Sequence, residues 1–266
     1  MIRLAFIFPT THLEATAAGD IEMALSQLVL ARPDYQAHYR TAAANGRWVL
    51  LDNGAFELQE HGRGLDADDV IHAGRMIGAA ELICTDVLYD ARGTVETTRD
   101  FISHVQREGV PFKLMGVPHG RDVDEYLWCY KQLAADPNIH SIGVSKLEAP
   151  RLLDGAYMAE TRVALVNMIW EYCQQHRFGD CPMKPIHLLG GDRSLPEELL
   201  RQKGSAAGKA GFIRSEDSSF AYWYGKHNVP WQNEEMTIAV EELGRPDLEG
   251  RVDREGLARS YALMAW

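Results

Sequence analysis

The sequence of 266 residues has no apolar run that approaches the length of a membrane span, so it predicts no membrane partner. It also has no low-complexity tract, internal repeat or linker that would separate domains. We therefore expect a single domain over residues 1–266. The N-terminal segment MIRLAFIFPTTHL has one Arg and no small-residue cleavage pattern, and we expect a first strand there and not a signal peptide.

Cysteine is scarce, and no two cysteines form a CxxC pair. The four cysteines are Cys84, Cys129, Cys173 and Cys181. Free thiols are typical of a reducing cytosol, so we expect a cytoplasmic protein. Cys173 and Cys181 lie near His176 and His187 in the sequence. This spacing matches no common zinc pattern, and we predict no metal site.

Positive charge is scarce as well, because 27 Lys and Arg residues against 38 Asp and Glu residues give a net charge of -11. Broad binding to a polyanion depends on Lys and Arg side chains that neutralise phosphates. The composition therefore argues against such binding, although it leaves room for a local basic groove. A protein partner that supplies a basic surface is an open alternative.

What is present is a regular alternation of short apolar runs with longer amphipathic ones. The short runs are closed by Gly, Pro or Asp, as is typical of strands buried on both faces. The predicted strands cover residues 2–9, 48–54, 81–86, 112–118, 141–146, 186–191 and 211–217. The predicted helices cover residues 20–31, 66–78, 94–109, 122–136 and 156–176. We expect Asp20 to be the N-cap of the first helix.

This alternation predicts an α/β fold with a parallel sheet, and seven such units favour a (β/α)8 TIM-type barrel. The eighth strand has no clear position, since the segment after Asp217 is aromatic and then helical. A doubly wound open sheet is the alternative. The usual Gly-rich dinucleotide fingerprint is missing after the first strand.

Chemistry in a barrel of this kind is located at the C-terminal ends of the strands. Several polar residues and glycines fall at those ends. They are Asp52, Asp86, His119, Gly143, Ser145, Lys146, Gly190 and Asp217. Each has a structural interpretation by itself: Asp52 with the next two residues is a turn signature, and Asp217 before two serines is a possible N-cap. Their joint placement indicates an active site.

Five segments resemble, in order, the motifs of the tRNA-guanine transglycosylases. LDNGAF (51–56), LMGVPHG (114–120), HSIGVSKLEAP (140–150), IHLLGGDRSLPEELL (186–200) and GFIRSEDSSFAYWYG (211–225) are similar to that family's DSGGF/Y, GIVQGG, YAIGGLAVGE, YLMGVGTPEDLL and FDCVLPTRNAR. Order and spacing agree over residues 48–225. The family is a (β/α)8 barrel, which agrees with the prediction from the strand and helix pattern.

Two departures from the family point to a different polymer substrate. The tRNA enzymes carry a CxCxxC-plus-His zinc site, whereas this chain has no Cys after Cys181, so we expect no zinc subdomain. The basic TRNAR stretch is replaced by SSFAYWY. The chain is closer to the small phage-type relatives that exchange guanine in DNA for a 7-deazaguanine. The resemblance implies DNA and a free base such as 7-cyano-7-deazaguanine as partners, no cofactor, and a bacterial or phage-infected cytoplasm.

The resemblance also implies roles for individual residues. Asp217 is the nucleophile that forms a covalent glycosyl-enzyme at C1′, and Asp52 handles protons as one base leaves and another enters. Asp86 matches the acidic residue at the purine edge, where a carboxylate accepts from N1–H and the 2-amino group of guanine. His119 replaces a Gln of the family as a donor toward the 7-substituent.

The remaining implied contacts surround the flat base and the strand. Phe56 and Leu189 match the positions that sandwich the base. The other residues expected to bind substrate are Gly143, Val144, Ser145 and Gly190. The aromatic and cationic segment 220–231 suits unstacked nucleotides, with packing of the last helix as the alternative.

Other functions are compatible with the same residues. A deazapurine nucleosidase acting on free nucleosides would use the two Asp residues with water as acceptor, and the net charge of -11 favours it. A tRNA-guanine transglycosylase is a second alternative. An accessory subunit is a third, although the presence of Asp217 argues against it. A barrel enzyme that forms a Schiff base through Lys146 is a fourth.

Overall fold

The computed structural model describes residues 1–55, 65–155, 157–176, 181–191 and 195–222. The strands are β1 (Arg3–Phe6), β2 (Glu22–Leu25), β3 (Val49–Asp52), β4 (Glu81–Ile83), β5 (Lys113–Gly116), β6 (Ile139–Ser145), β7 (Ile186–Gly191) and β8 (Ile213–Ser218). The helices are the 3-10 helix η1 (Thr10–Ala18), α1 (Ser26–Ala31), α2 (Pro33–Ala44), α4 (Ala67–Ile77), α5 (Ala91–Glu108), α6 (Val123–Ala135), α7 (Glu148–Leu152), α8 (Met158–Gln175), α9 (Leu195–Gly204) and α10 (Ala206–Lys209).

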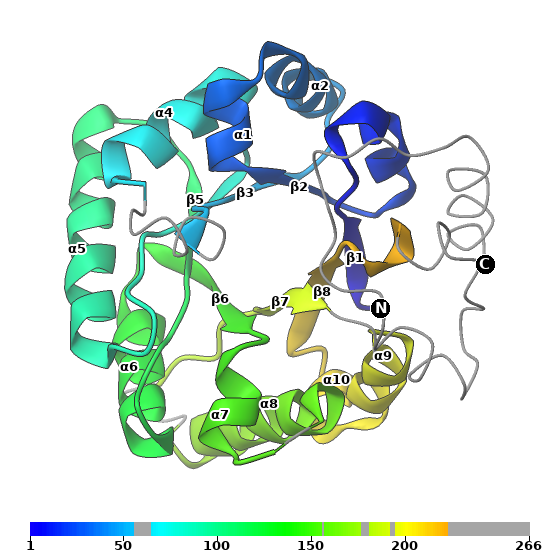
Figure 1. Cartoon of the computed structure of the whole chain (residues 1–266). Helices are drawn as coiled ribbons and strands as arrows, with labels where there is room; N and C mark the ends of the chain where they lie inside the picture. Colours follow the sequence, from blue (N-terminus) through cyan, green and yellow to red (C-terminus); the bar gives the residue numbers. More distant parts are fainter. Residues whose placement is uncertain (56–64, 156, 177–180, 192–194, 223–266) are drawn as a thin grey trace.

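The eight strands are all parallel and form one nearly closed barrel with the helices around it (Figure 1). Their order in the sheet is β1-β8-β7-β6-β5-β4-β3-β2. The predicted (β/α)8 TIM-type barrel is therefore confirmed, and the open sheet is not adopted. All seven predicted strands are present, and the helix expected after Asp217 lies outside the described residues. Within the described part, no helix has the length and apolar character needed to cross a membrane.

The predicted helix over residues 20–31 is wrong in its first half, which contains the missing strand β2. Asp20 is not a helix cap. Its backbone N–H donates to the carbonyl of Leu4 at 2.7 Å, and its Oδ2 accepts from the Leu4 N–H at 3.0 Å. These bonds hold the segment in the sheet beside β1. A short apolar run can be buried in a sheet or on the inner face of a helix, so the sequence pattern alone does not separate the two.

The strands that close the barrel, β1 and β2, are joined by very little backbone pairing. A single parallel bridge joins Ala5 to Ile21, whereas β2 pairs with β3 along its whole length. The Ile21 N–H also donates to the Leu4 carbonyl at 3.2 Å. In a longer ladder the Leu4 N–H would donate to a backbone carbonyl of β2. Here it donates to the side chain of Asp20.

Side chains fill the interior of the barrel, while the outer faces of the strands pack against the helices. The interior cluster consists of Ala5, Ile21, Met23, Leu50, Ile83, Met115 and Val117. Gly143 on β6 faces this cluster: a Cβ atom there would lie 2.6 Å from Leu189 Cδ1 and 3.0 Å from Val117 Cγ2. Because this part of the interior is packed, a ligand has room only at the open ends of the barrel.

We expect Gly143→Val to lower the free energy of unfolding by about 1–3 kcal/mol, because the added atoms overpack the interior against Leu189 and Val117. Urea unfolding followed by circular dichroism measures this change. Gly204→Ala is the matched control, since no atom lies within 4 Å of a Cβ atom added at Gly204. Equal stability of the two variants would contradict the packed interior.

Candidate active site

The predicted residues gather at one end of the barrel. Those at or just after the C-terminal ends of their strands are Asp52, Asp86, His119, Ser145, Gly190 and Asp217. In a barrel of parallel strands these ends open on the same mouth, so the prediction that they share one face agrees with the fold. Phe56 lies outside the described residues.

Asp217 is a buried carboxylate near the end of β8, with only 3% of its surface exposed. Its Oδ1 accepts from His187 Nε2 at 3.0 Å and from the Gly190 N–H at 3.0 Å. Gly190 has a φ of 71°, in the left-handed region that glycine adopts without strain. Among the described residues no hydrogen bond reaches Oδ2. Two donors thus fix the carboxylate through one oxygen and leave the other for a reacting atom.

His187 connects Asp217 to a line of polar groups inside the barrel. Its Nδ1 lies 2.7 Å from Ser215 Oγ, and Arg214 Nε donates to the same Oγ at 3.2 Å. Arg214 Nη1 forms an ion pair with Glu81 at 2.9 Å. Because Arg214 donates to Ser215, the hydroxyl hydrogen is directed to His187 Nδ1. This pattern assigns the imidazole proton to Nε2, which points to Asp217.

A second buried ion cluster supports β7 and β8 from the helix side. Arg162 on α8 is fully buried and binds Glu198 through Nε at 2.5 Å and through Nη2 at 2.6 Å. Its Nη2 also contacts Glu216 at 2.5 Å, and its Nη1 donates to the Leu189 carbonyl at 2.8 Å. Burial, with the nearby charge of Glu198, raises the pKa of Glu216 well above its usual value.

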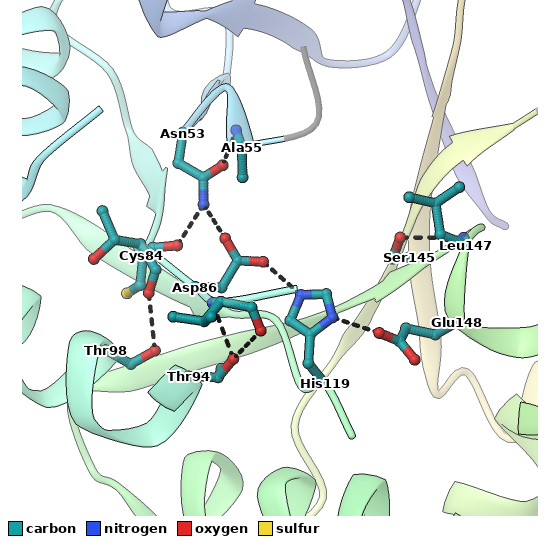
Figure 2. A network of polar contacts seen from close by, with 12 residues as sticks. Asn53, Ala55, Cys84, Asp86, Thr94, Thr98, His119, Ser145, Leu147 and Glu148 are labelled. Atoms are coloured by element: carbon teal, nitrogen blue, oxygen red, sulfur yellow. Dashed lines mark hydrogen bonds and ion pairs between the residues drawn. The ribbon is translucent and has the colours of Figure 1, made fainter. Parts of the chain in front are cut away.

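Asp86 follows β4, and its carboxylate lies between Asn53, which follows β3, and His119, which follows β5 (Figure 2). Its Oδ1 accepts from Asn53 Nδ2 at 2.7 Å. The same Nδ2 donates to the Cys84 carbonyl at 2.7 Å, and Asn53 Oδ1 accepts from the Ala55 N–H at 2.9 Å. Three bonds thus set the orientation of the Asn53 amide, and the amide in turn sets that of the Asp86 carboxylate.

His119 lies between two carboxylates, as Figure 2 shows. Its Nε2 is 2.6 Å from Asp86 Oδ2, and its Nδ1 is 2.5 Å from Glu148 Oε1. Burial alone would lower the pKa of His119, but the hydrogen bonds to Asp86 and Glu148 outweigh it and raise the pKa to about 9. The sequence predicts that His119 donates to a substrate group, yet both ring nitrogens have carboxylate partners here.

The remaining predicted residues differ in which side of the sheet they face and in what they contact. Val144 belongs to the core cluster that packs between sheet and helices, so only its backbone is available to a ligand. Ser145 Oγ accepts from the Leu147 N–H at 3.2 Å. Leu189 packs against the interior cluster. The stem of Lys146 lies over Gly190, where an added Cβ atom would be 3.1 Å from Lys146 Cδ.

Asp52 occupies the inward-facing row of β3. Leu50, two residues earlier, belongs to the interior cluster, and alternate residues of a strand share a face. The Asp52 carbonyl accepts a hydrogen bond from the Ser26 hydroxyl. Asp52 and Asp217 therefore both lie on the inner rim of the barrel, on strands separated by β1 and β2.

Three residues of this site, Asn53, Glu148 and His187, were not predicted as functional. His187 lies two residues before Leu189 on the same strand, so the period of two could have placed it on the inward face. Glu148 begins the short helix α7, three residues beyond the end of β6. Its contact with His119, 29 residues earlier, has no signal in the sequence.

Metal-ligating side chains do not gather in the described part of the chain, where no group of three or more His, Cys, Asp or Glu residues is arranged to hold an ion. Cys173 and Cys181 are 3.5 Å apart at their sulfur atoms, whereas His187 lies inside the barrel beside Asp217. No protein-family model matches the chain, and no curated protein matches it.

We expect the stability contributed by His119 to depend on pH, because its folded pKa of about 9 lies above its ordinary value of 6.5. A raised pKa means that this stability is complete below about pH 6.5 and is lost as the pH rises through about 9. Urea unfolding of the protein and of His119→Gln across this range measures it. The difference between the two should shrink with rising pH, and a constant difference would contradict a charged imidazole.

We expect Arg162→Met to lower the free energy of unfolding by about 3–5 kcal/mol, because it leaves the Glu198 carboxylate buried without a partner. The double variant Arg162→Met/Glu198→Gln should recover part of this loss. Arg201→Met is the matched control, since Arg201 is 44% exposed in its ion pairs and should change stability by about 0–1 kcal/mol. Similar losses for Arg162 and Arg201 would contradict the buried cluster.

Proposed function

We propose that this protein is a base-exchange transglycosylase that replaces guanine in DNA with a 7-deazaguanine through a covalent intermediate on Asp217. One observation carries the proposal. Asp217 is buried at the barrel mouth, and His187 Nε2 and the Gly190 N–H both bind its Oδ1. These two donors fix the direction of the carboxylate. Such a group is suited to attack an electrophilic carbon.

The first half of the reaction breaks the bond between guanine N9 and C1′ of the sugar. Asp217 Oδ2 forms a bond to C1′, and the electron pair of the N9–C1′ bond stays with guanine. The transition state resembles an oxocarbenium ion, which a nearby carboxylate stabilises. Asp52, on the inner rim at β3, gives a proton to the departing guanine.

The second half reverses these steps with a different base. N9 of the incoming 7-deazaguanine forms a bond to C1′ and displaces the Asp217 carboxylate with its electron pair. Asp52 takes the N9 proton, so both Asp residues return to their starting forms. One N-glycosidic bond is exchanged for another, and the reaction therefore needs neither ATP nor a redox cofactor.

The mouth also has a group suited to recognise the base. Asp86 lies across from β8 with its carboxylate oriented by Asn53 and His119. An ionised carboxylate accepts from two neighbouring donors, and the N1–H and 2-amino groups of guanine are such a pair. The resemblance to the transglycosylases implies these roles for Asp86 and Asp217, and Asp217 belongs to the last of the five motifs. A base in duplex DNA must be flipped out of the stack to reach such a mouth.

The net charge of -11 favours a second candidate function, hydrolysis of free deazapurine nucleosides. The same Asp217 intermediate would form, and water would displace it in place of an incoming base. A free nucleoside has no phosphate to repel. The two functions differ in the acceptor and in the size of the substrate, so a single set of reactions separates them.

We expect the protein to incorporate 7-cyano-7-deazaguanine into DNA, as measured by mass spectrometry of nucleosides after enzymatic digestion. Parallel reactions contain duplex DNA, single-stranded DNA, tRNA, or free guanosine and deoxyguanosine. Asp217→Asn keeps the shape of the side chain but not its charge, and should lower the rate by about 10³-fold or more. Asp100→Asn is the control, because Asp100 is 70% exposed on α5.

Each outcome of these reactions decides between the functions. Incorporation in DNA that is lost in Asp217→Asn and kept in Asp100→Asn supports the proposal. Incorporation in tRNA alone keeps the mechanism and changes the polymer. Release of base from nucleosides without incorporation supports the nucleosidase. Incorporation that survives Asp217→Asn would remove Asp217 as the nucleophile.

A further inference from the structure

Asp86 begins a series of linked ionisable side chains, of which Figure 2 shows His119 and Glu148. From Asp86 it passes to His119 and then to Glu148, with contacts of 2.6 and 2.5 Å. Glu148 Oε2 continues it to Arg151 Nη2 at 2.5 Å. The His119 and Glu148 side chains are 1% and 0% exposed, so water does not share these bonds.

The positions of Asp86 and Glu148 on either side of His119 indicate how many protons the imidazole carries. A neutral imidazole has one N–H and one lone pair, so one of the two carboxylates would face a lone pair. An imidazolium donates from both nitrogens and satisfies Asp86 and Glu148 together. Asp86, His119, Glu148 and Arg151 then carry two negative and two positive charges, which makes their burial tolerable.

Two other titratable groups packed against these residues, Tyr126 and Cys129, carry no charge near neutral pH. Tyr126 and Cys129 on α6 face Glu148 and His119. Burial raises the pKa of Tyr126 well above its usual value and raises the pKa of Cys129 to about 12. Arg151 supplies the second cation from α7. Asp86 and Glu148, the two hydrogen-bond partners of His119, are therefore the groups that favour its protonation against the effect of burial.

Asp86 has capacity left after these bonds are made. A carboxylate has about four lone-pair sites, and Asp86 uses one on Oδ1 for Asn53 and one on Oδ2 for His119. Each oxygen can accept one more donor. A ligand that presents two adjacent N–H donors fits this remaining pair of sites, whereas a ligand with one donor leaves one of the two sites unfilled.

We propose that Glu148 and His119 are positioning residues that hold the Asp86 carboxylate in a fixed orientation, so that the site selects bases with two adjacent N–H donors. This inference rests on the proposed function for the identity of the ligand, a guanine-type base with N1–H and 2-amino groups. In it Asp86 contacts the base, and His119 acts only through Asp86. Hypoxanthine, which lacks the 2-amino group, is the natural competitor.

Removal of the negative charge of Glu148 tests the inference. In Glu148→Gln the amide oxygen still accepts from His119 Nδ1, but one of the two negative charges that hold the imidazolium is gone. The pKa of His119 should then fall toward or below its ordinary value of 6.5. Base binding should depend on pH between about pH 6 and 8 in this variant and stay flat in the wild type.

The measurement is equilibrium binding of guanine and of hypoxanthine, without turnover, over this pH range. We expect the wild type to prefer guanine by about tenfold or more at each pH. Glu148→Gln should match it at about pH 6 and lose about tenfold in guanine affinity at about pH 8. Glu148→Gln/His119→Gln should be flat, because it has no titrating ring. Glu125→Gln, which removes an acid from α6, should behave as the wild type.

Two results would overturn the inference: equal binding of guanine and hypoxanthine by the wild type, or a flat profile in Glu148→Gln. A thermal melt at each pH confirms that the variants are folded. Failure of base exchange leaves this result standing, because the assay measures binding only. Intact exchange together with a flat Glu148→Gln profile rejects the inference and keeps the proposed function.

Discussion

A carboxylate buried inside a barrel needs hydrogen-bond donors around it. This requirement determines which polar residues lie at both ends of the sheet. At the mouth, Asp217 is bound by His187 and Gly190. At the opposite end, Glu81 on β4 is fully buried and accepts from Arg214 and Trp48. Leaving any of these acids without its donors would cost several kcal/mol, of the order of the whole stability of a domain. Donors therefore had to be placed on neighbouring strands.

One irregularity of the sheet makes this placement possible. The pairing of β7 with β8 shifts between Ile186, opposite Ile213, and His187, opposite Ser215. The extra residue is Arg214, which reaches Glu81 while Ser215 meets His187. Without the shift, strict alternation would turn either Arg214 or Ser215 toward the helices. The line from Glu81 to Asp217 thus depends on one extra residue in β8.

Local pattern was sufficient for most of the fold, because seven strands are short apolar runs with Gly, Pro or Asp after them. It failed at β2, where EMAL in residues 22–25 suits a helix and a strand equally and only contact with Leu4 decides. The site followed the same division. The positions of Asp86, His119 and Asp217 at strand ends could be predicted, because strand ends are local features. The position of the Glu148 carboxylate at the back of His119 could not, since that contact exists only in three dimensions.

The buried charges of the barrel and the net charge of the rest of the chain bear on two different aspects of the proposed function. Inside, the acids Asp86, Glu148, Glu81 and Glu198 are matched by His119, Arg151, Arg214 and Arg162. The net charge of -11 therefore belongs mainly to the remainder of the chain and acts on whatever approaches the protein. In the proposed function, binding of the base depends on the short-range donors around Asp86 and Asp217. Whether the proposed substrate is DNA or a free nucleoside depends on the outer charge, so an acidic net charge is compatible with the proposed selectivity for guanine at the mouth.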